Sequence, residues 1–106
     1  MTTLKSIDVK QLKQWLDRGE AILVDVREPS EHAAEHIDIA KLAPLSEVTS
    51  DALRNAAGKI VVFHCRSGMR TQTNAAKLAA CAAGEAFYLK GGIEAWKAAG
   101  LPVQRR

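Results

Sequence analysis

The fold of the protein is indicated by residues 59–71, which read KIVVFHCRSGMRT. We expect a strand at 59–64, because its apolar run is typical of a strand buried on both faces of a sheet. A polar loop with one glycine follows at 65–70, and the alanine-rich stretch at 71–83 has the composition of a helix. A strand, a short loop and a helix in this order predict one unit of an α/β sheet.

The same alternation of short apolar runs and helical patterns continues on both sides of this stretch. Further strands are expected at 21–26, 40–45 and 85–89, and helices at 11–16, 29–36, 46–57 and 93–99. Because the connections between strands have the length of helices, the sheet should be mostly parallel, with about four or five strands.

Length and composition exclude several classes of protein. A chain of 106 residues, 47% of them hydrophobic, has the size and apolar content of one domain over 1–106. No apolar run approaches the roughly 20 residues that cross a bilayer, and residues 1–6 lack the apolar segment of a signal peptide. Two cysteines are too few for a disulfide scaffold and suit a reducing compartment. We therefore expect a cytoplasmic protein with no membrane segment in this chain.

The charge of the chain also limits its partners. Fifteen Lys and Arg against twelve Asp and Glu leave a net charge of +3, and the charges are spread along the chain. With few aromatic residues and no basic cluster, the sequence does not indicate a nucleic-acid surface. The mild excess of positive charge suits a small anionic substrate.

The residues around Cys65 favour a reactive cysteine. Cys65 comes directly after a buried strand, at the edge of an α/β sheet where ligands bind. The backbone N–H groups of 66–70, the start of the next helix and the side chains of Arg66 and Arg70 all favour a thiolate over a thiol. A buried, unreactive cysteine is the alternative, but its charged neighbours are unfavourable in a buried core position. We predict that Cys65 is a nucleophile and that Thr71 is the N-cap of the helix.

Four segments resemble motifs of the rhodanese family. CRSGMRT at 65–71 is similar to the family pattern C-x-x-G-x-R-[S/T], and DVREPSE at 25–31 to D-V-R-x-x-x-E. EHI at 35–37 is similar to part of G-H-I-P-G-A, and GGIEAWKAAGLPV at 91–103 to G-G-x-x-x-W-x-x-A-G-x-P-V. The four lie in the family's order between about residue 20 and residue 103, so the chain is identified as a member of this family.

The sequence departs from the family at one loop. Glu35 stands where the family usually has glycine, and Asp38 and Ile39 stand where it has Pro-Gly, so we expect this loop to differ locally. The spacing also resembles bacterial rhodanese domains that are tethered to the inner membrane by a downstream hairpin. No such hairpin follows here, and the chain would be either a complete small enzyme or a domain of a longer protein.

The resemblance implies a three-layer fold with helices on both faces of the sheet, and sulfurtransferase activity in sulfur metabolism. Cys65 would take sulfane sulfur from thiosulfate or another persulfide donor and pass it to a thiol or cyanide acceptor, with a sulfur-relay protein as a further partner. The covalent persulfide on Cys65 would be the intermediate, without a separate cofactor or a metal. The small anionic donor would be bound by the loop residues Arg66, Ser67, Gly68, Met69 and Arg70.

Two further residues are expected to support this loop. Asp25 and Arg27 could act as acid–base groups, but the favoured interpretation is that Asp25 ends a strand beside the loop and Arg27 pairs with a nearby carboxylate. His64 precedes Cys65 on the same strand, so its side chain should point to the opposite face. Cys81 is expected to be buried and inert, although a resolving role stays open.

One motif suggests a metal site. HAAEH at 32–36 fits the H-x-x-E-H pattern of inverted zinc peptidases, and two histidines four residues apart share a helix face. The helix would have only about two turns, however, and such a short pattern arises easily by chance. The resemblance instead gives His36 a structural position behind the second strand. Trp15 and Trp96 are expected in the core or at its rim.

Two other functions stay open beside sulfur transfer. A phosphatase or arsenate reductase of the same fold also uses a loop cysteine. In the loops typical of such enzymes, five residues separate the cysteine from the arginine. Here only four residues separate Cys65 from Arg70, and the smaller ring would crowd a tetrahedral phosphate. A non-catalytic rhodanese-like interaction module is the third reading, and such modules usually lack the loop cysteine.

Overall fold

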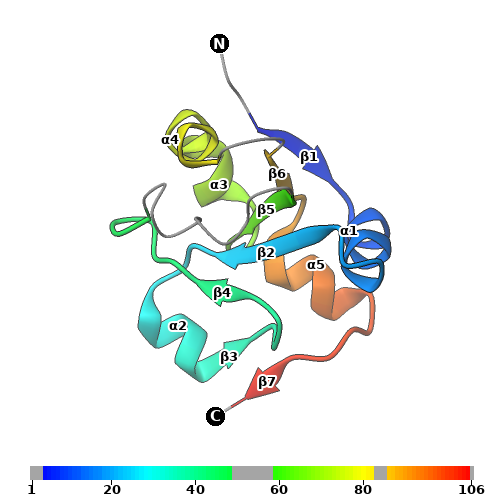
Figure 1. Ribbon diagram of the computed structural model, residues 1–106. Coiled ribbons are helices and arrows are strands. Elements are labelled where there is room, and N and C mark those ends of the chain that lie inside the picture. Colours follow the sequence, from blue (N-terminus) through cyan, green and yellow to red (C-terminus); the bar gives the residue numbers. More distant parts are fainter. Residues whose placement is uncertain (1–3, 49–58, 83–85, 106) are drawn as a thin grey trace.

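The structure is a computed structural model in which residues 4–48, 59–82 and 86–105 are described. Its centre is a five-stranded sheet with the order β1-β6-β5-β2-β4, in which every neighbouring pair is parallel (Figure 1). The strands are β1 (Lys5–Ile7), β2 (Ala21–Asp25), β4 (Lys41–Leu42), β5 (Ile60–His64) and β6 (Ala86–Leu89). The predicted mostly parallel sheet is confirmed, and β5, the strand before Cys65, lies at its centre.

The helices form layers on the two faces of the sheet (Figure 1). They are α1 (Val9–Asp17), α2 (Pro29–Ala34), α3 (Met69–Thr73), α4 (Ala75–Cys81) and α5 (Gly92–Ala98). Side chains alternate along β5, so Val62 packs with Leu12 of α1 and Trp96 of α5, whereas Phe63 packs with Leu78 of α4. Apolar helix faces therefore bury both sides of the sheet, as expected for an α/β fold.

Three short strands are absent from the sequence prediction. β1 has three residues, and β3 (Glu35–His36) pairs antiparallel with β7 (Gln104–Arg105) in a separate two-stranded sheet. Strands of two or three residues are too short to show the alternation on which sequence analysis depends. The expected strand at 40–45 is present but shorter, as β4, and the expected helix at 46–57 lies mostly outside the described residues.

The helix expected at 71–83 differs from the structure at its start and in its middle. It begins at Met69, and it is interrupted at Asn74, which separates α3 from α4. The Asn74 side-chain amide donates to the carbonyl of Arg70 at 2.9 Å. Asparagine side chains compete with backbone hydrogen bonds in this way, which explains the interruption.

The described helices are all short. The longest, α1, has nine residues, and none within the described ranges has the length and apolar character that crossing a bilayer requires.

Candidate active site

Cys65 lies at the carboxyl end of the central strand, with its sulfur inside the loop that follows. Its side chain is buried, at 1% exposure, and the backbone N–H of Gly68 donates to Cys65 Sγ at 3.1 Å. Thr71 Oγ1 lies 4.0 Å from the same sulfur and donates to the carbonyl of Gly68 at 2.8 Å. A donor aimed at a buried sulfur stabilises negative charge there without rearrangement.

Gly68 gives the loop its shape. Its φ of 96° is in the left-handed region, which glycine adopts without steric cost. Gly68, not Thr71, is the N-cap of α3, so the expected N-cap at Thr71 is wrong. Thr71 lies in the first turn instead, where its hydroxyl donates to the Gly68 carbonyl within the loop. The left-handed turn at Gly68 starts the helix two residues earlier than the sequence pattern suggests.

The start of α5 holds the loop from the other side. Backbone N–H groups of Ile93 and Glu94 donate to the carbonyls of Cys65 and Arg66 at 2.9 and 3.1 Å. Gly92 packs so closely that an added Cβ would collide with the Cys65 carbonyl oxygen and come within 2.6 Å of the Arg66 carbonyl. The paired glycines found in the sequence therefore allow two segments of backbone to touch, and this contact fixes the carbonyls on either side of the Cys65–Arg66 bond.

The two loop arginines have different surroundings. Arg70 donates to both carboxylate oxygens of Glu31 in α2, at 2.7 and 2.8 Å. The bond from Arg70 is the main cause that lowers the pKa of Glu31 below its usual value. Arg66 is exposed and forms no ion pair with the residues that the structure describes. Both arginines were expected to face a donor anion, but of the two only Arg66 has a charge that no described residue balances.

Two further residues of the predicted binding loop are exposed. Ser67 is exposed, and Met69, the first residue of α3, has 66% of its surface exposed. Their proposed roles in binding stay predictions.

A buried ionic network lies beside the loop at the end of β2. Asp25 is fully buried, and Arg27 donates to its carboxylate through Nε, through Nη2 and through its backbone N–H at 2.9–3.2 Å. Arg27 also donates to the Glu35 carbonyl at 2.6 Å, and His32 Nδ1 lies 2.9 Å from Asp25 Oδ2. Burial alone would raise the pKa of Asp25, but the Arg27 bonds and the neighbouring histidines lower it to about 2. Arg27 thus pairs with a carboxylate as expected, and that carboxylate is Asp25.

His64 connects this network with the cysteine strand. It is fully buried and pairs in register with Asp25, and its Nε2 lies 3.8 Å from Asp25 Oδ2. Its Nδ1 lies 3.3 Å from the Cys65 carbonyl oxygen, while Nε2 has no hydrogen-bond partner in the described part of the chain. Burial lowers the pKa of His64 to about 4. Sequence analysis placed His64 away from Cys65 but did not foresee this contact through the backbone.

The histidines of the HAAEH motif have structural partners. The rings of His32 and His36 stack with centroids 4.2 Å apart, and His36 Nδ1 lies 2.9 Å from the His32 carbonyl oxygen. Among the described residues, no three His, Cys, Asp or Glu side chains are grouped so that they could hold a metal ion.

Cys81 and the tryptophans lie outside the loop. Cys81 is half-buried at the end of α4, so the expectation that it is buried is only partly met, and its Sγ lies 3.8 Å from the Val48 carbonyl oxygen. Trp96 is buried and donates to the Pro102 carbonyl at 2.8 Å. The Trp15 ring packs at 5.1 Å from that of Phe87, so both tryptophans are in the core or at its rim.

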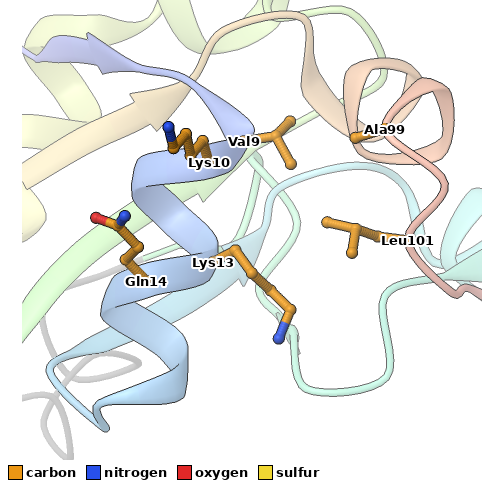
Figure 2. A pocket seen from close by; sticks show the side chains of 6 residues that line it. All are labelled: Val9, Lys10, Lys13, Gln14, Ala99 and Leu101. Atoms are coloured by element: carbon orange, nitrogen blue, oxygen red, sulfur yellow. The ribbon is translucent and has the colours of Figure 1, made fainter.

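Two hollows lie near α5. One, of about 240 Å³, adjoins the active loop through Arg66 and is lined by Arg27, Glu31, Ala34, Glu35, Arg66, Ile93, Glu94 and Lys97. The other, of about 300 Å³, lies between α1 and the residues after α5, and Figure 2 shows its side chains Val9, Lys10, Lys13, Gln14, Ala99 and Leu101. The second hollow contains no residue of the loop at 65–70, so only the first belongs to the surroundings of Cys65.

The geometry agrees with the comparisons with known proteins. Residues 8–99 match the rhodanese-like domain family. A sulfurtransferase of Allochromatium vinosum is 35% identical over 101 residues, which cover 94% of each chain. An uncharacterised protein of Synechocystis is 40% identical over 98 residues, 92% of this chain but 55% of that protein.

A solved structure shows the same fold. The crystal structure of a thiosulfate sulfurtransferase from Pseudomonas aeruginosa superimposes with a TM-score of 0.84 at 27% identity, covering 98% of this chain and 20% of that one. The chain thus spans about half of the Synechocystis protein and a fifth of the Pseudomonas chain, but nearly all of the Allochromatium protein. With the family matched over most of its length and its loop cysteine at the carboxyl end of the central strand, the chain belongs to the rhodanese family.

Proposed function

We propose that this protein is a sulfurtransferase that carries sulfane sulfur as a persulfide on Cys65. The observation that carries the proposal is the Gly68 N–H, which points at Cys65 Sγ from 3.1 Å inside a loop held by α5. Membership of the rhodanese family and the sulfurtransferase of Allochromatium vinosum support the reaction class.

The donor in this proposal is thiosulfate or another small anion with a sulfane sulfur. The Cys65 thiolate attacks the outer sulfur of thiosulfate, a new S–S bond forms, and sulfite leaves with the electron pair of the broken S–S bond. Arg66 makes the direct contact with the sulfonate oxygens, because no carboxylate in the described part of the chain balances its charge. Arg70 contributes less, since Glu31 balances its charge.

The second half of the proposed reaction releases the sulfur. A thiolate or cyanide attacks the outer sulfur of the persulfide, and Cys65 leaves as a thiolate ready for another cycle. Until then the negative outer sulfur lies among N–H donors of the loop, which stabilise it as they stabilise an oxyanion in other enzymes. These steps use only the Cys65 sulfur and the residues around it. A sulfur-relay protein is a candidate acceptor of the same chemistry.

Loading of the protein with sulfur tests this proposal. After incubation with thiosulfate, we expect a mass gain of one sulfur atom on the peptide that contains Cys65, and its loss on treatment with cyanide or a reductant. The matched control is the peptide that contains Cys81, which should gain no sulfur. A gain on Cys81 alone, or no gain at all, contradicts the proposal, and turnover of aryl phosphates at a comparable rate would favour the phosphatase alternative.

A further inference from the structure

The hollow beside Arg66 has an unusual balance of charges. Three cations, Arg27, Arg66 and Lys97, and three carboxylates, Glu31, Glu35 and Glu94, line its volume of about 240 Å³. Most of these six groups already form ion pairs or hydrogen bonds within the protein. The charges that remain available determine what the hollow is able to bind.

Four of these six groups are held by strong partners. Arg27 is bound to the buried Asp25, and Glu31 to Arg70. Glu35 accepts from Lys97 at 2.8 Å and from Arg105 at 2.7 Å. Their charges are balanced by short hydrogen bonds, so a ligand would gain little from displacing them.

The other two groups, one of each sign, have no short hydrogen bond to an opposite charge among the described residues. Arg66 is exposed and has no ion pair with any residue of the described ranges. The nearest cation to Glu94 is Lys97 at 3.7 Å, beyond hydrogen-bond distance, and the Glu94 side chain is 53% exposed. Beside the buried Ile93, the hollow is therefore lined by a guanidinium with no ion pair to a described residue and by a carboxylate whose ion pair with Lys97 is long and lacks a hydrogen bond.

We propose that this hollow binds the ammonium and carboxylate groups of an amino-acid-like thiol, which is the sulfur acceptor. Arg66 would hold the carboxylate in a bidentate pair, and Glu94 would accept from the ammonium group. The volume is below the roughly 300–1,000 Å³ of pockets for drug-sized ligands, and it suits a ligand the size of one or two amino acids. The inference rests on the proposed function of Cys65, because it names the acceptor of the same site.

The position of the hollow explains how it would act on the reaction. Cys65 does not line it, but Arg66 is the next residue and Ile93 N–H binds the Cys65 carbonyl. The hollow would hold the non-reacting end of the acceptor, and its thiolate would reach past Arg66 to the outer sulfur of the persulfide. An S–S bond to the acceptor forms, the bond to Cys65 Sγ breaks, and the thiol proton goes to solvent. Binding energy from the remote end thereby orients the attack.

Acceptors that differ in one charged group test this inference. Cysteine carries both groups, 3-mercaptopropionate lacks the ammonium group and 2-mercaptoethanol lacks both. Rates are compared at equal thiolate concentration, because the thiolate is the nucleophile, and each is divided by the rate of the same protein with cyanide. We expect kcat/KM for cysteine to exceed that for 3-mercaptopropionate by about tenfold, which corresponds to one charge-assisted hydrogen bond of about 1.4 kcal/mol, and to exceed that for 2-mercaptoethanol, which lacks two such bonds, by more.

Two glutamate variants isolate the contribution of the hollow. Glu94→Gln should bring cysteine to within about twofold of 3-mercaptopropionate, because the partner of the ammonium group is lost. Glu20→Gln is the matched control: Glu20 is 48% exposed and also lies 3.7 Å from a cation, Arg18, but it precedes β2 at the opposite edge of the sheet. Glu20→Gln should keep the preference for cysteine. No preference in the wild type, or the same preference in Glu94→Gln, overturns the inference.

A binding measurement separates this inference from the proposed function. S-methylcysteine has both charged groups but no thiol, so its binding needs no sulfur transfer. In NMR titrations we expect it to shift the amide signals of Ile93, Glu94 and Lys97, and to do so less in Glu94→Gln. Absence of these shifts overturns the hollow as a binding site whether or not Cys65 carries sulfur. A wild type that shows the shifts but forms no persulfide supports the site and contradicts only the proposed function.

Discussion

The two cysteines of the chain show how the backbone around a sulfur atom differs between a loop and a helix end. Cys65 is the more buried of the two, yet its sulfur accepts the N–H of Gly68. Cys81 is half-buried at the end of α4, and its sulfur faces the carbonyl oxygen of Val48. An N–H group stabilises a negative sulfur, whereas a carbonyl oxygen suits a thiol that keeps its proton. The direction of the neighbouring backbone dipoles, more than exposure, therefore distinguishes the proposed reactive cysteine.

Exchange of each sulfur for oxygen is the strongest test of this comparison. Cys65→Ser should lower sulfur transfer from thiosulfate to cyanide by at least ~10³-fold, because a serine hydroxyl forms no persulfide. Cys81→Ser should keep activity within about twofold and stability within about 1 kcal/mol. Steady-state thiocyanate formation and urea unfolding measure the two quantities. Residual activity in Cys65→Ser that disappears only in the double variant would move the reactive sulfur to Cys81.

The surroundings of Cys65 also depend on contacts that the sequence shows only in part. The loop cysteine and the central strand follow from the local pattern at 59–71, because each is encoded by neighbouring residues, and the parallel sheet follows from the helix-length connections between successive strands. The pairing of Arg70 with Glu31 joins residues 39 positions apart, and no local pattern reveals it. The same holds for the contact of α5 with the loop, although the paired glycines at 91–92 were a visible signal. β7 was missed because a two-residue strand has no periodicity of its own.

The contact between α5 and the loop leads to the second prediction, which compares two glycines. Gly92 and Gly100 both have positive φ, 58° and 80°. An added Cβ at Gly92 would collide with the carbonyls of Cys65 and Arg66, whereas at Gly100 it meets nothing within 4 Å. Gly92→Ala should cost about 3 kcal/mol or more and most of the activity. Gly100→Ala should cost about 1–2 kcal/mol from backbone conformation alone and keep the activity of the folded protein.

Thermal or urea unfolding together with thiocyanate formation checks both variants. Equal losses of stability and activity in the two would mean that the left-handed conformation, and not the contact with the loop, is what each glycine supplies.

The two arginines of the loop provide the third prediction. Arg66→Met should raise KM for thiosulfate about tenfold with little change in stability, because Arg66 is exposed and has no ion pair with a described residue. Arg70→Met should raise KM less and lower stability by up to about 1 kcal/mol, since it breaks a half-exposed pair with Glu31. Initial rates over a range of thiosulfate concentrations separate the two effects. A larger rise in KM for Arg70→Met would restore Arg70 as the main binding cation.

The fourth prediction concerns the buried histidine that contacts the Cys65 carbonyl. The pKa of His64 falls to about 4 in the folded protein from an ordinary value near 6.5. Between these values the unfolded chain binds more protons than the folded one, so stability decreases as the pH falls through this window and levels off below about 4. From pH 7 to pH 6 we expect a loss of about 0.7 kcal/mol from this group.

Urea unfolding at several pH values measures this dependence, with His64→Gln and His64→Asn as variants that keep a polar side chain without the titration. Either variant, if it folds, should show a flatter profile between pH 7 and pH 5 than the wild type. The carboxylate of Asp25 titrates only near pH 2, and its stabilising bonds with Arg27 persist throughout this range. An unchanged slope in both variants would mean that the pKa of His64 does not shift on folding. A wild type that gains stability relative to both variants as the pH falls from 7 would instead mean that His64 is protonated in the folded protein, with its charge balanced by Asp25 at 3.8 Å. In that case the group behind Cys65 would be an imidazolium, whose positive charge would add to the N–H of Gly68 in stabilising the sulfur.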